Sequence, residues 1–275
     1  MTNIGKEMRM RRIFDPDTKT SVMFACSHGT STPEILKGIE DVRLPVKAAI
    51  EGGANVIFLS LGMAEHCIDL FAKDNHPALA LKVSATAALY EVPFQEVQIA
   101  NVQTALEIGA DAIVALIPLT ATNEKENIKL ASQLGEECYR KGMPFIAEAE
   151  FPNVYHQTVN EYTKKLDYKY LMRTARMCVE LGADIIKTNW TGNADEFCQV
   201  INCVPGIPVV VAGGSYINEI DLLNRMAEAM SLGAVGCSVG RNIFQHKDPV
   251  GMTKALCAIV RGQLTVEKAA LLVNN

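Results

Sequence analysis

Lys187 is the residue of this sequence whose surroundings indicate chemistry most directly. It ends the apolar run 184–187, which is typical of a buried strand, and the polar residues Thr188 and Asn189 follow it. A buried charge is costly, so such a lysine either extends its ammonium group to solvent or is desolvated for a functional reason. Desolvation lowers the pKa of an amine, and a neutral amine can attack a carbonyl carbon and form a Schiff base. Thr188 and Asn189 are then candidate contacts to the substrate.

Two glycine-containing segments are candidates for binding a phosphate group. One strand-like run ends in Ala212, Gly213 and Gly214, and a later run ends in Gly240 and Arg241. Glycines let backbone N–H groups approach an oxyanion closely, and an arginine can add a charge-assisted hydrogen bond. A tight turn would explain the glycine pair alone, but the two segments together predict a phosphate site made of all five residues.

Other polar side chains stand at the ends of further strand-like runs. Lys82 can hold a second anionic group of the substrate or act on the reactive lysine through its charge, and a structural salt bridge is the alternative. Glu148 and Glu150 lie two residues apart, hence on one face of a strand, and each is a candidate general acid or base or a polar residue of the rim. Ser27 and His28 follow the first run, and the histidine can titrate near neutral pH or orient a substrate by a hydrogen bond. We therefore expect catalytic roles for His28 and Glu148, and substrate contacts from Ser27 and Lys82.

Eight apolar runs rich in β-branched residues have the length of strands, and segments with helical periodicity separate them. The runs are 22–26, 55–60, 79–84, 112–118, 144–148, 184–187, 208–212 and 235–239. A Gly-Ala pattern recurs at Gly53, Gly109, Gly182 and Gly233, each time between a helical segment and a strand. Glycine can end a helix there in a left-handed conformation without a Cβ clash.

This organisation predicts an α/β fold, a single-domain (β/α)8 TIM barrel. Apolar strands that alternate with helices indicate a parallel sheet buried on both faces, and closure into a barrel is the natural solution. An open doubly wound sheet is the alternative, but no Gly-x-Gly-x-x-Gly follows the first run. We expect residues 21–275 to form the barrel and residues 1–20 to form a polar N-terminal arm. The long segments 29–44 and 150–167 are candidate lids at the carboxyl ends of strands, or solvated connections.

Composition argues against several other classes of protein. The 275 residues carry a net charge of −5, with 49% hydrophobic and 21% charged residues, as in an ordinary globular domain that binds no nucleic acid. No apolar run approaches the length of a membrane span, and the N-terminus lacks the apolar region of a signal peptide. The eight cysteines form no Cys-x-x-Cys pair and do not cluster with the five histidines. We therefore expect reduced thiols in a cytoplasmic protein, and no metal site.

Several of these segments resemble the class I aldolases of the DeoC/LacD type. The similarity covers most of the chain, and its most specific pieces are residues 186–188 with 191–192, residues 212–214, and residues 240–245. The family includes archaeal-type fructose-bisphosphate aldolases, aminodideoxyheptulosonate synthase and the autoinducer-phosphate thiolase. Residues 240–245 are especially similar to the thiolase. The resemblance implies that Lys187 forms a covalent Schiff base without any cofactor, and that the glycine segments hold the phosphate of a small substrate. It also implies a homo-oligomer, with a ring-built decamer as one form.

Two positions depart from the family pattern and leave two functions open. The family usually has aspartate where this chain has Ser27, and many members have a proton-donating tyrosine where it has Phe151. His28, Glu148, Tyr155 or a bound water would have to take over the proton transfer. We expect a Schiff-base lyase or transferase, an aldolase or a related thiolase, that acts on a phosphorylated ketose or diketone. The alternative is a phosphosugar-binding or regulatory barrel that lacks the usual proton-transfer residues.

Overall fold

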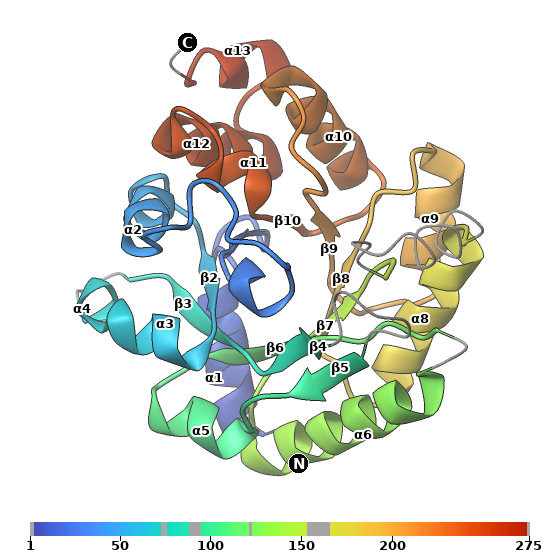
Figure 1. The fold of residues 1–275 in the computed structure, drawn as a ribbon. Coiled ribbons are helices and arrows are strands. Elements are labelled where there is room, and N and C mark those ends of the chain that lie inside the picture. Colours follow the sequence, from blue (N-terminus) through green and yellow to red (C-terminus); the bar gives the residue numbers. More distant parts are fainter. Residues whose placement is uncertain (1–2, 73–75, 88–94, 121–122, 153–165, 274–275) are drawn as a thin grey trace.

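The computed structural model describes residues 3–72, 76–87, 95–120, 123–152 and 166–273. Eight parallel strands close into a barrel in the order β1-β10-β9-β8-β7-β6-β3-β2, and helices surround it (Figure 1). The barrel strands are β1 Ser21–Ala25, β2 Val56–Leu59, β3 Ala78–Lys82, β6 Ala112–Leu116, β7 Phe145–Ala149, β8 Ile185–Thr188, β9 Val209–Ala212 and β10 Gly236–Val239. The predicted TIM barrel is confirmed, and every predicted strand matches an observed one with ends that differ by at most two residues.

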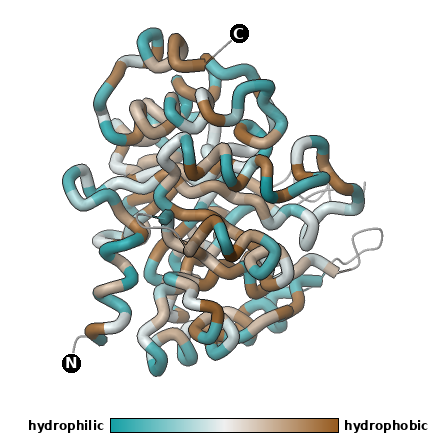
Figure 2. The backbone as a smooth tube through the Cα atoms, turned by 90° about the vertical axis from the view of Figure 1, so that its left-hand side faces the viewer, coloured by the Kyte–Doolittle hydropathy of each residue, from teal (hydrophilic) through white to brown (hydrophobic). Residues whose placement is uncertain are grey.

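Helices precede the first barrel strand, occupy most of the connections between barrel strands and follow the last strand. They are α1 Ile4–Ile13, η1 His28–Thr30, α2 Arg43–Glu51, α3 Leu61–His66, α4 Ile68–Phe71, α5 Val102–Glu107, α6 Glu124–Lys141, α8 Tyr168–Glu180, α9 Ala194–Asn202, α10 Glu219–Ser231, α11 Arg241–Phe244, α12 Pro249–Val260 and α13 Val266–Ala270. The interior of the molecule is mostly brown in the hydropathy view, whereas the surrounding helices alternate between brown and teal (Figure 2). The alternation is that of amphipathic helices packed on a buried sheet. Within the described ranges, no helix is long and apolar enough to cross a membrane.

The four glycines of the recurring Gly-Ala pattern adopt the left-handed conformation predicted for them. Their φ angles are 88° at Gly53, 74° at Gly109, 99° at Gly182 and 106° at Gly233. A residue with a Cβ is strained in this region, so glycine is favoured where the chain leaves a helix and turns back toward the barrel. The repeat in the sequence thus records the same helix-to-strand turn made four times.

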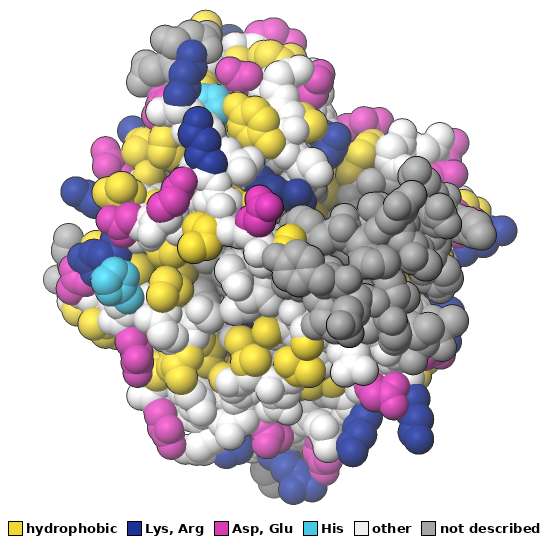
Figure 3. All heavy atoms as spheres, viewed as in Figure 1, with side chains coloured by type: hydrophobic (Ala, Val, Ile, Leu, Met, Phe, Trp, Pro, Cys, Tyr) yellow, Lys and Arg dark blue, Asp and Glu magenta, His cyan; other side chains and the backbone are white. Residues whose placement is uncertain are grey.

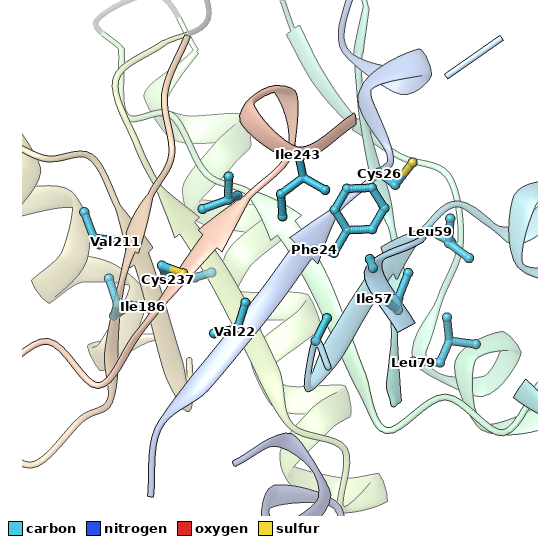
Figure 4. Packing of buried hydrophobic residues seen from close by; sticks show 14 of the residues in the cluster. Val22, Phe24, Cys26, Ile57, Leu59, Leu79, Ile186, Val211, Cys237 and Ile243 are labelled. Atoms are coloured by element: carbon cyan, nitrogen blue, oxygen red, sulfur yellow. The ribbon is translucent and has the colours of Figure 1, made fainter. Parts of the chain in front are cut away.

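Side chains of the barrel strands alternate between two packing layers. Val22, Phe24, Ile57 and Ile186 belong to the outer layer, where the strands meet the helices (Figure 4). The inner layer fills the barrel and contains Met23, Ala25, Val56, Phe58, Val114, Ile146, Ile185 and Val210. Because alternate residues of a strand face opposite sides, the inward position of Ile185 also turns Lys187 into the barrel.

Helix α1 covers the amino-terminal end of the barrel. Its last residue, Ile13, is fully buried and belongs to the inner packing layer. The Lys6 ammonium lies 2.9 Å from a carboxylate oxygen of Asp184, and Arg12 lies 3.2 Å from Asp111, two aspartates that precede β8 and β6. The N-terminal segment predicted to precede the barrel therefore supplies part of its core.

The sequence analysis does not predict a short antiparallel hairpin that follows β3. Strand β4 (Ser84–Ala87) pairs with β5 (Gln95–Gln98), and β4 lies against β6 (Figure 1). Only Val83 separates β3 from β4, so the predicted strand 79–84 runs past the end of β3 to the first residue of β4. In β5 the one buried residue is Glu96, so this strand lacks the alternating apolar pattern that announces a half-buried strand.

Replacing Ile13 by alanine should destabilise the protein through the core rather than through the helix. The substitution Ile13→Ala leaves a cavity in the inner layer, and we expect the free energy of unfolding to fall by about 2–5 kcal/mol. Ile4→Ala is the matched control on the same helix, because Ile4 is 77% exposed and should change stability by no more than about 0.5 kcal/mol. Urea denaturation measures both values, and equal small effects would show that α1 is not part of the core.

Candidate active site

A cavity of about 250 Å³ opens at the carboxyl ends of the barrel strands. The predicted residues that line it are Ser27, His28, Lys82, Glu148, Lys187, Asn189, Ala212, Gly213, Gly214, Gly240 and Arg241. Figure 3 shows the molecule as spheres, viewed as in Figure 1. Acidic and basic side chains lie next to one another near the middle of this face. The barrel therefore brings eleven of the twelve predicted site residues to one place.

Thr188 is the predicted site residue that the structure does not bring to this cavity. It follows Lys187 on the same strand, so its side chain points to the opposite face. The Thr188 hydroxyl is fully buried and donates a 2.9 Å hydrogen bond to the backbone oxygen of Ala149. Its contact supports the pairing of β7 with β8 instead of a ligand.

The Lys187 ammonium contacts two carboxylates in the cavity. Its Nζ atom lies 2.7 Å from Oε1 of Glu148 and 3.0 Å from Oε1 of Glu150. The strand register explains the arrangement, because Glu148 of β7 is paired directly with Lys187 of β8 and Glu150 follows on the same face. Only 7% of Lys187 is exposed, and its Nζ lies 5.9 Å from the centre of the Phe58 ring below it.

Glu148 also holds a second lysine. Its other oxygen, Oε2, forms a buried ion pair with Lys82, which extends into the barrel from the end of β3. Lys82, Glu148, Lys187 and Glu150 therefore form a row of alternating charges, which we call the charge row. Alternation lets each buried charge face an opposite one, which offsets much of the cost of desolvation.

The charge row changes the protonation state expected for Lys187. Burial lowers the pKa of its ammonium, but the charges of Glu148 and Glu150 and their hydrogen bonds act more strongly, so the pKa is raised. The prediction of a neutral, desolvated amine is wrong for the resting protein, because the carboxylates come from a neighbouring strand that the local sequence does not reveal. For the Glu148 carboxyl, burial raises the pKa, because it disfavours the charged form. The positive charges of Lys187 and Lys82 outweigh burial, lower this pKa and hold the carboxyl ionised.

His28 is neutral at physiological pH, contrary to the expectation that it titrates there. Burial, together with the positive charges of Lys187 and Arg241, lowers the pKa of its imidazole to about 3. The ring lies 5.1 Å from that of Phe244, and an added Cβ on Gly240 would come within 2.4 Å of its Cε1 atom. Gly240 is therefore needed for the histidine to pack over the end of β10.

The two glycine segments lie side by side and are fastened by Asn242. The Asn242 Nδ2 donates to the backbone oxygens of Gly213 (3.2 Å) and Ser215 (3.0 Å), and its Oδ1 accepts from the N–H of Ile217 (2.8 Å). The Asn242 side chain thus fixes the shape of the loop after β9 from the start of α11. The sequence analysis did not assign this residue, although it follows directly after Arg241.

The cavity also contains residues that the sequence analysis did not place there. They are Ser31, Ser215, Ser238, Leu116, Ala25 and Pro152. Glu150, which the sequence analysis gave as a candidate acid or base, and Phe151, at the family's tyrosine position, line the cavity as well. The Phe151 ring stacks on that of Tyr170, with 5.8 Å between their centres. Tyr155 and most of the candidate lid 150–167 lie outside the described residues.

Glu96 of the hairpin is a further buried carboxyl close to the charge row. It accepts hydrogen bonds from the hydroxyls of Ser84 (2.5 Å) and Thr86 (2.8 Å). Burial raises its pKa, and the charge of Lys82 opposes this effect. The Ser84 oxygen in turn accepts from the N–H of Leu116, so the hairpin is fastened to β6 beside the cavity. Among the described residues, no group of three His, Cys, Asp or Glu side chains is placed to hold a metal ion.

Comparison with known proteins identifies the family. Residues 15–246 match the sequence profile described as DeoC/LacD family aldolase. The chain belongs to this family. It is 32% identical over 265 residues to 2-amino-3,7-dideoxy-D-threo-hept-6-ulosonate synthase 1 of Archaeoglobus fulgidus, which covers 96% of this chain and 94% of the relative. The 2-amino-3,7-dideoxy-D-threo-hept-6-ulosonate synthase of Halobacterium salinarum is 27% identical over 269 residues, which cover 98% of this chain and 96% of the relative.

Solved structures of fructose-bisphosphate aldolases have the same fold. An archaeal fructose 1,6-bisphosphate aldolase superposes with a TM-score of 0.78 at 24% identity, covering 94% of this chain and 99% of that one. Another, described for the mechanism of the Schiff base forming fructose-1,6-bisphosphate aldolase, superposes with a TM-score of 0.77 at 25% identity, covering 93% and 99%. The resemblance inferred from the sequence is thereby confirmed.

The buried state of His28 can be tested by its titration. We expect the NMR signals of its ring to remain those of neutral imidazole between about pH 5 and 8, because burial and the neighbouring cations disfavour the proton. Below the unfolded value of 6.5 and down to about 3, the unfolded chain binds a proton at this histidine that the folded chain does not, so stability falls as the pH falls through this window. A ring that titrates with a midpoint between about 6 and 7 would contradict the structure.

Proposed function

We propose that this protein is a Schiff-base-forming class I aldolase that cleaves a carbon–carbon bond of a phosphorylated ketose or diketone. The observation that carries the proposal is the contact of Lys187 with two carboxylates inside a cavity that also holds two glycine loops and an arginine. The names of its relatives agree with this class, since they include synthases of an aminodideoxyheptulosonate and Schiff-base fructose-bisphosphate aldolases. The cavity combines a nucleophile, a proton acceptor and a place for an anion.

Glu150 is the better placed of the two carboxylates to carry protons. Glu148 is held between two ammonium groups, which keep its pKa low, so it is a poor base and serves to position both lysines. Glu150 lies 3.0 Å from the Lys187 amine and forms no other ion pair among the described residues. It also lies closer to the mouth, with 20% of its side chain exposed.

Schiff-base formation begins with a proton transfer from the Lys187 ammonium to the Glu150 carboxylate. The neutral amine attacks the substrate carbonyl carbon, and the product is a carbinolamine. Glu150 returns its proton to the carbinolamine hydroxyl, which leaves as water while the C=N bond of the iminium forms. The net reaction consumes one ammonium and one carbonyl and yields one iminium and one water.

Cleavage then uses the iminium as an electron sink. The hydroxyl two carbons away gives its proton to Glu150, its oxygen forms a new C=O bond, and the carbon–carbon bond breaks. The electron pair of that bond enters the C=N system and gives an enamine with a neutral nitrogen. Glu150 protonates the enamine carbon, and hydrolysis of the resulting iminium frees Lys187.

The phosphate of the substrate binds at the glycine loops. Gly213, Gly214, Gly240 and Arg241 line the same cavity as the charge row. The Nε atom of Arg241 is buried and has no hydrogen-bond partner among the described residues, so it is available to an anion. Loops after the last two strands are the usual phosphate site of this fold.

Binding without turnover is the competing function, and one observation favours it. Phe151 lines the cavity at the position where many family members have a proton-donating tyrosine, and its ring cannot carry a proton. If neither Glu150 nor a bound water replaces the tyrosine, the protein binds its phosphorylated ligand and does not cleave it.

Three variants separate catalysis from binding. With fructose 1,6-bisphosphate as the probe, we expect borohydride to trap an adduct on Lys187 in the wild type, an adduct that forms more slowly in Glu150→Gln, and no adduct in Lys187→Ala. The Glu150→Gln protein should cleave the probe about 100- to 10,000-fold more slowly, because it lacks the proton carrier. Glu136→Gln is the control, since Glu136 is exposed and its one ion pair among the described residues is with Arg140 of the same helix.

Mass spectrometry of the reduced protein and a coupled assay of the triose product measure the two steps. A wild-type protein that binds the probe but gives neither adduct nor product would favour the binding function. Unchanged cleavage by Glu150→Gln would show that another group carries the proton.

A further inference from the structure

Ser238 is a buried cavity residue without a function in the proposed mechanism. It lies on β10 with its side chain turned into the barrel, is 2% exposed and lines the same cavity as Lys187. Its hydroxyl oxygen has no hydrogen-bond partner among the described residues. Ser21, on the neighbouring strand β1, provides a comparison, because it is equally buried but donates a 2.7 Å hydrogen bond to the backbone oxygen of Ile13.

The strand register explains why the Ser238 hydroxyl is unsatisfied. Its partner on β9 is Ala212 and its partner on β1 is Met23, and neither side chain offers a hydrogen-bonding group. Its backbone oxygen is occupied, since it accepts a 3.0 Å hydrogen bond from the N–H of Gly213. A buried hydroxyl without a partner disfavours folding, and such a group in a cavity is explained by a ligand that completes its hydrogen bonds.

Ser238 also shares the cavity with the two anchors of the proposed substrate. Gly240 of the phosphate site is two residues further along the same face of β10, so Ser238 lies one layer deeper in the barrel. Lys187 is on β8, separated from β10 only by β9. A molecule with its phosphate at the glycine loops and its carbonyl carbon at Lys187 can therefore turn its far end, beyond the carbonyl, toward the Ser238 hydroxyl.

We propose that Ser238 is a specificity-determining residue whose hydroxyl hydrogen-bonds to the hydroxyl group next to the reacting carbonyl of a phosphorylated hydroxyketone. This inference rests on the proposed function, because it uses the two anchors of that site. A serine hydroxyl can both donate and accept, so it pairs with a substrate hydroxyl in either direction. An analogue without this hydroxyl leaves the buried Ser238 unpaired, and an enzyme discriminates strongly against such an analogue.

Two ligands that differ by one hydroxyl test the proposal. Dihydroxyacetone phosphate carries a hydroxymethyl group beside its carbonyl, and hydroxyacetone phosphate carries a methyl group there, so the hydroxyl is replaced by hydrogen. We expect titration calorimetry to show that the wild type binds the first about tenfold or more tightly than the second, and that Ser238→Ala removes most of this preference. The melting temperature of Ser238→Ala should equal or exceed that of the wild type, because the substitution removes an unsatisfied buried group.

Ser21→Ala is the matched control. It removes a buried serine hydroxyl that has a partner, so its melting temperature should fall while the preference between the two ligands stays that of the wild type. An equal preference in the wild type and Ser238→Ala would overturn the proposal, as would a wild type that does not bind dihydroxyacetone phosphate. Borohydride trapping of the same ligand on Lys187 is read separately, so a failure of Schiff-base formation is distinguishable from a failure of the Ser238 contact.

Discussion

The active cavity depends on one buried interaction, the carboxylate of Glu148 between the ammonium groups of Lys82 and Lys187. Two lysines inside a barrel would be very costly to bury without a shared counter-charge, and removal of that charge would leave Lys82 without its ion-pair partner and Lys187 with Glu150 alone. The same interaction fixes where the Lys187 amine lies and keeps it protonated at rest. In the mechanism we propose, the substrate meets a protonated Lys187, and a second carboxylate, Glu150, accepts its proton.

The barrel makes this interaction possible through strand geometry. Glu148 and Lys187 are paired residues of neighbouring parallel strands, and inward-facing positions recur at every second residue. Below the charge row the inner layer of the barrel is apolar and ends at Ile13 of α1, so the bottom of the cavity is apolar. Above it lie the loops after β9 and β10, which we propose to bind the phosphate, and Asn242 holds these loops together. Low polarity below and directed donors above are the conditions under which charges act strongly on a reacting group.

The sequence predicts those features of the fold and site that local patterns encode. Eight apolar runs and four glycine turns are enough for the barrel, and a lysine at the end of an apolar run is enough to single out Lys187. The hairpin β4–β5 escapes prediction because its buried residue is a glutamate, Glu96, which gives no apolar signal. The charge state of Lys187 and the low pKa of His28 also escape, since both depend on groups that other strands and loops bring near. In the sequence, Ser238 looks like any other serine of a strand. The strand register is needed to show that it is paired with Ala212 and Met23, and its hydroxyl has no hydrogen-bond partner among the described residues.

The central claim is that Lys187 forms a covalent bond to a phosphorylated carbonyl compound held by the glycine loops. The most direct measurement is a crystal structure of the protein soaked with dihydroxyacetone phosphate and reduced with borohydride. The account predicts continuous electron density from the Lys187 Nζ to the central carbon of the ligand, with the phosphate at Gly213, Gly214, Gly240 and Arg241. A ligand that occupies the cavity without a bond to Lys187, or whose phosphate lies away from these loops, would contradict it.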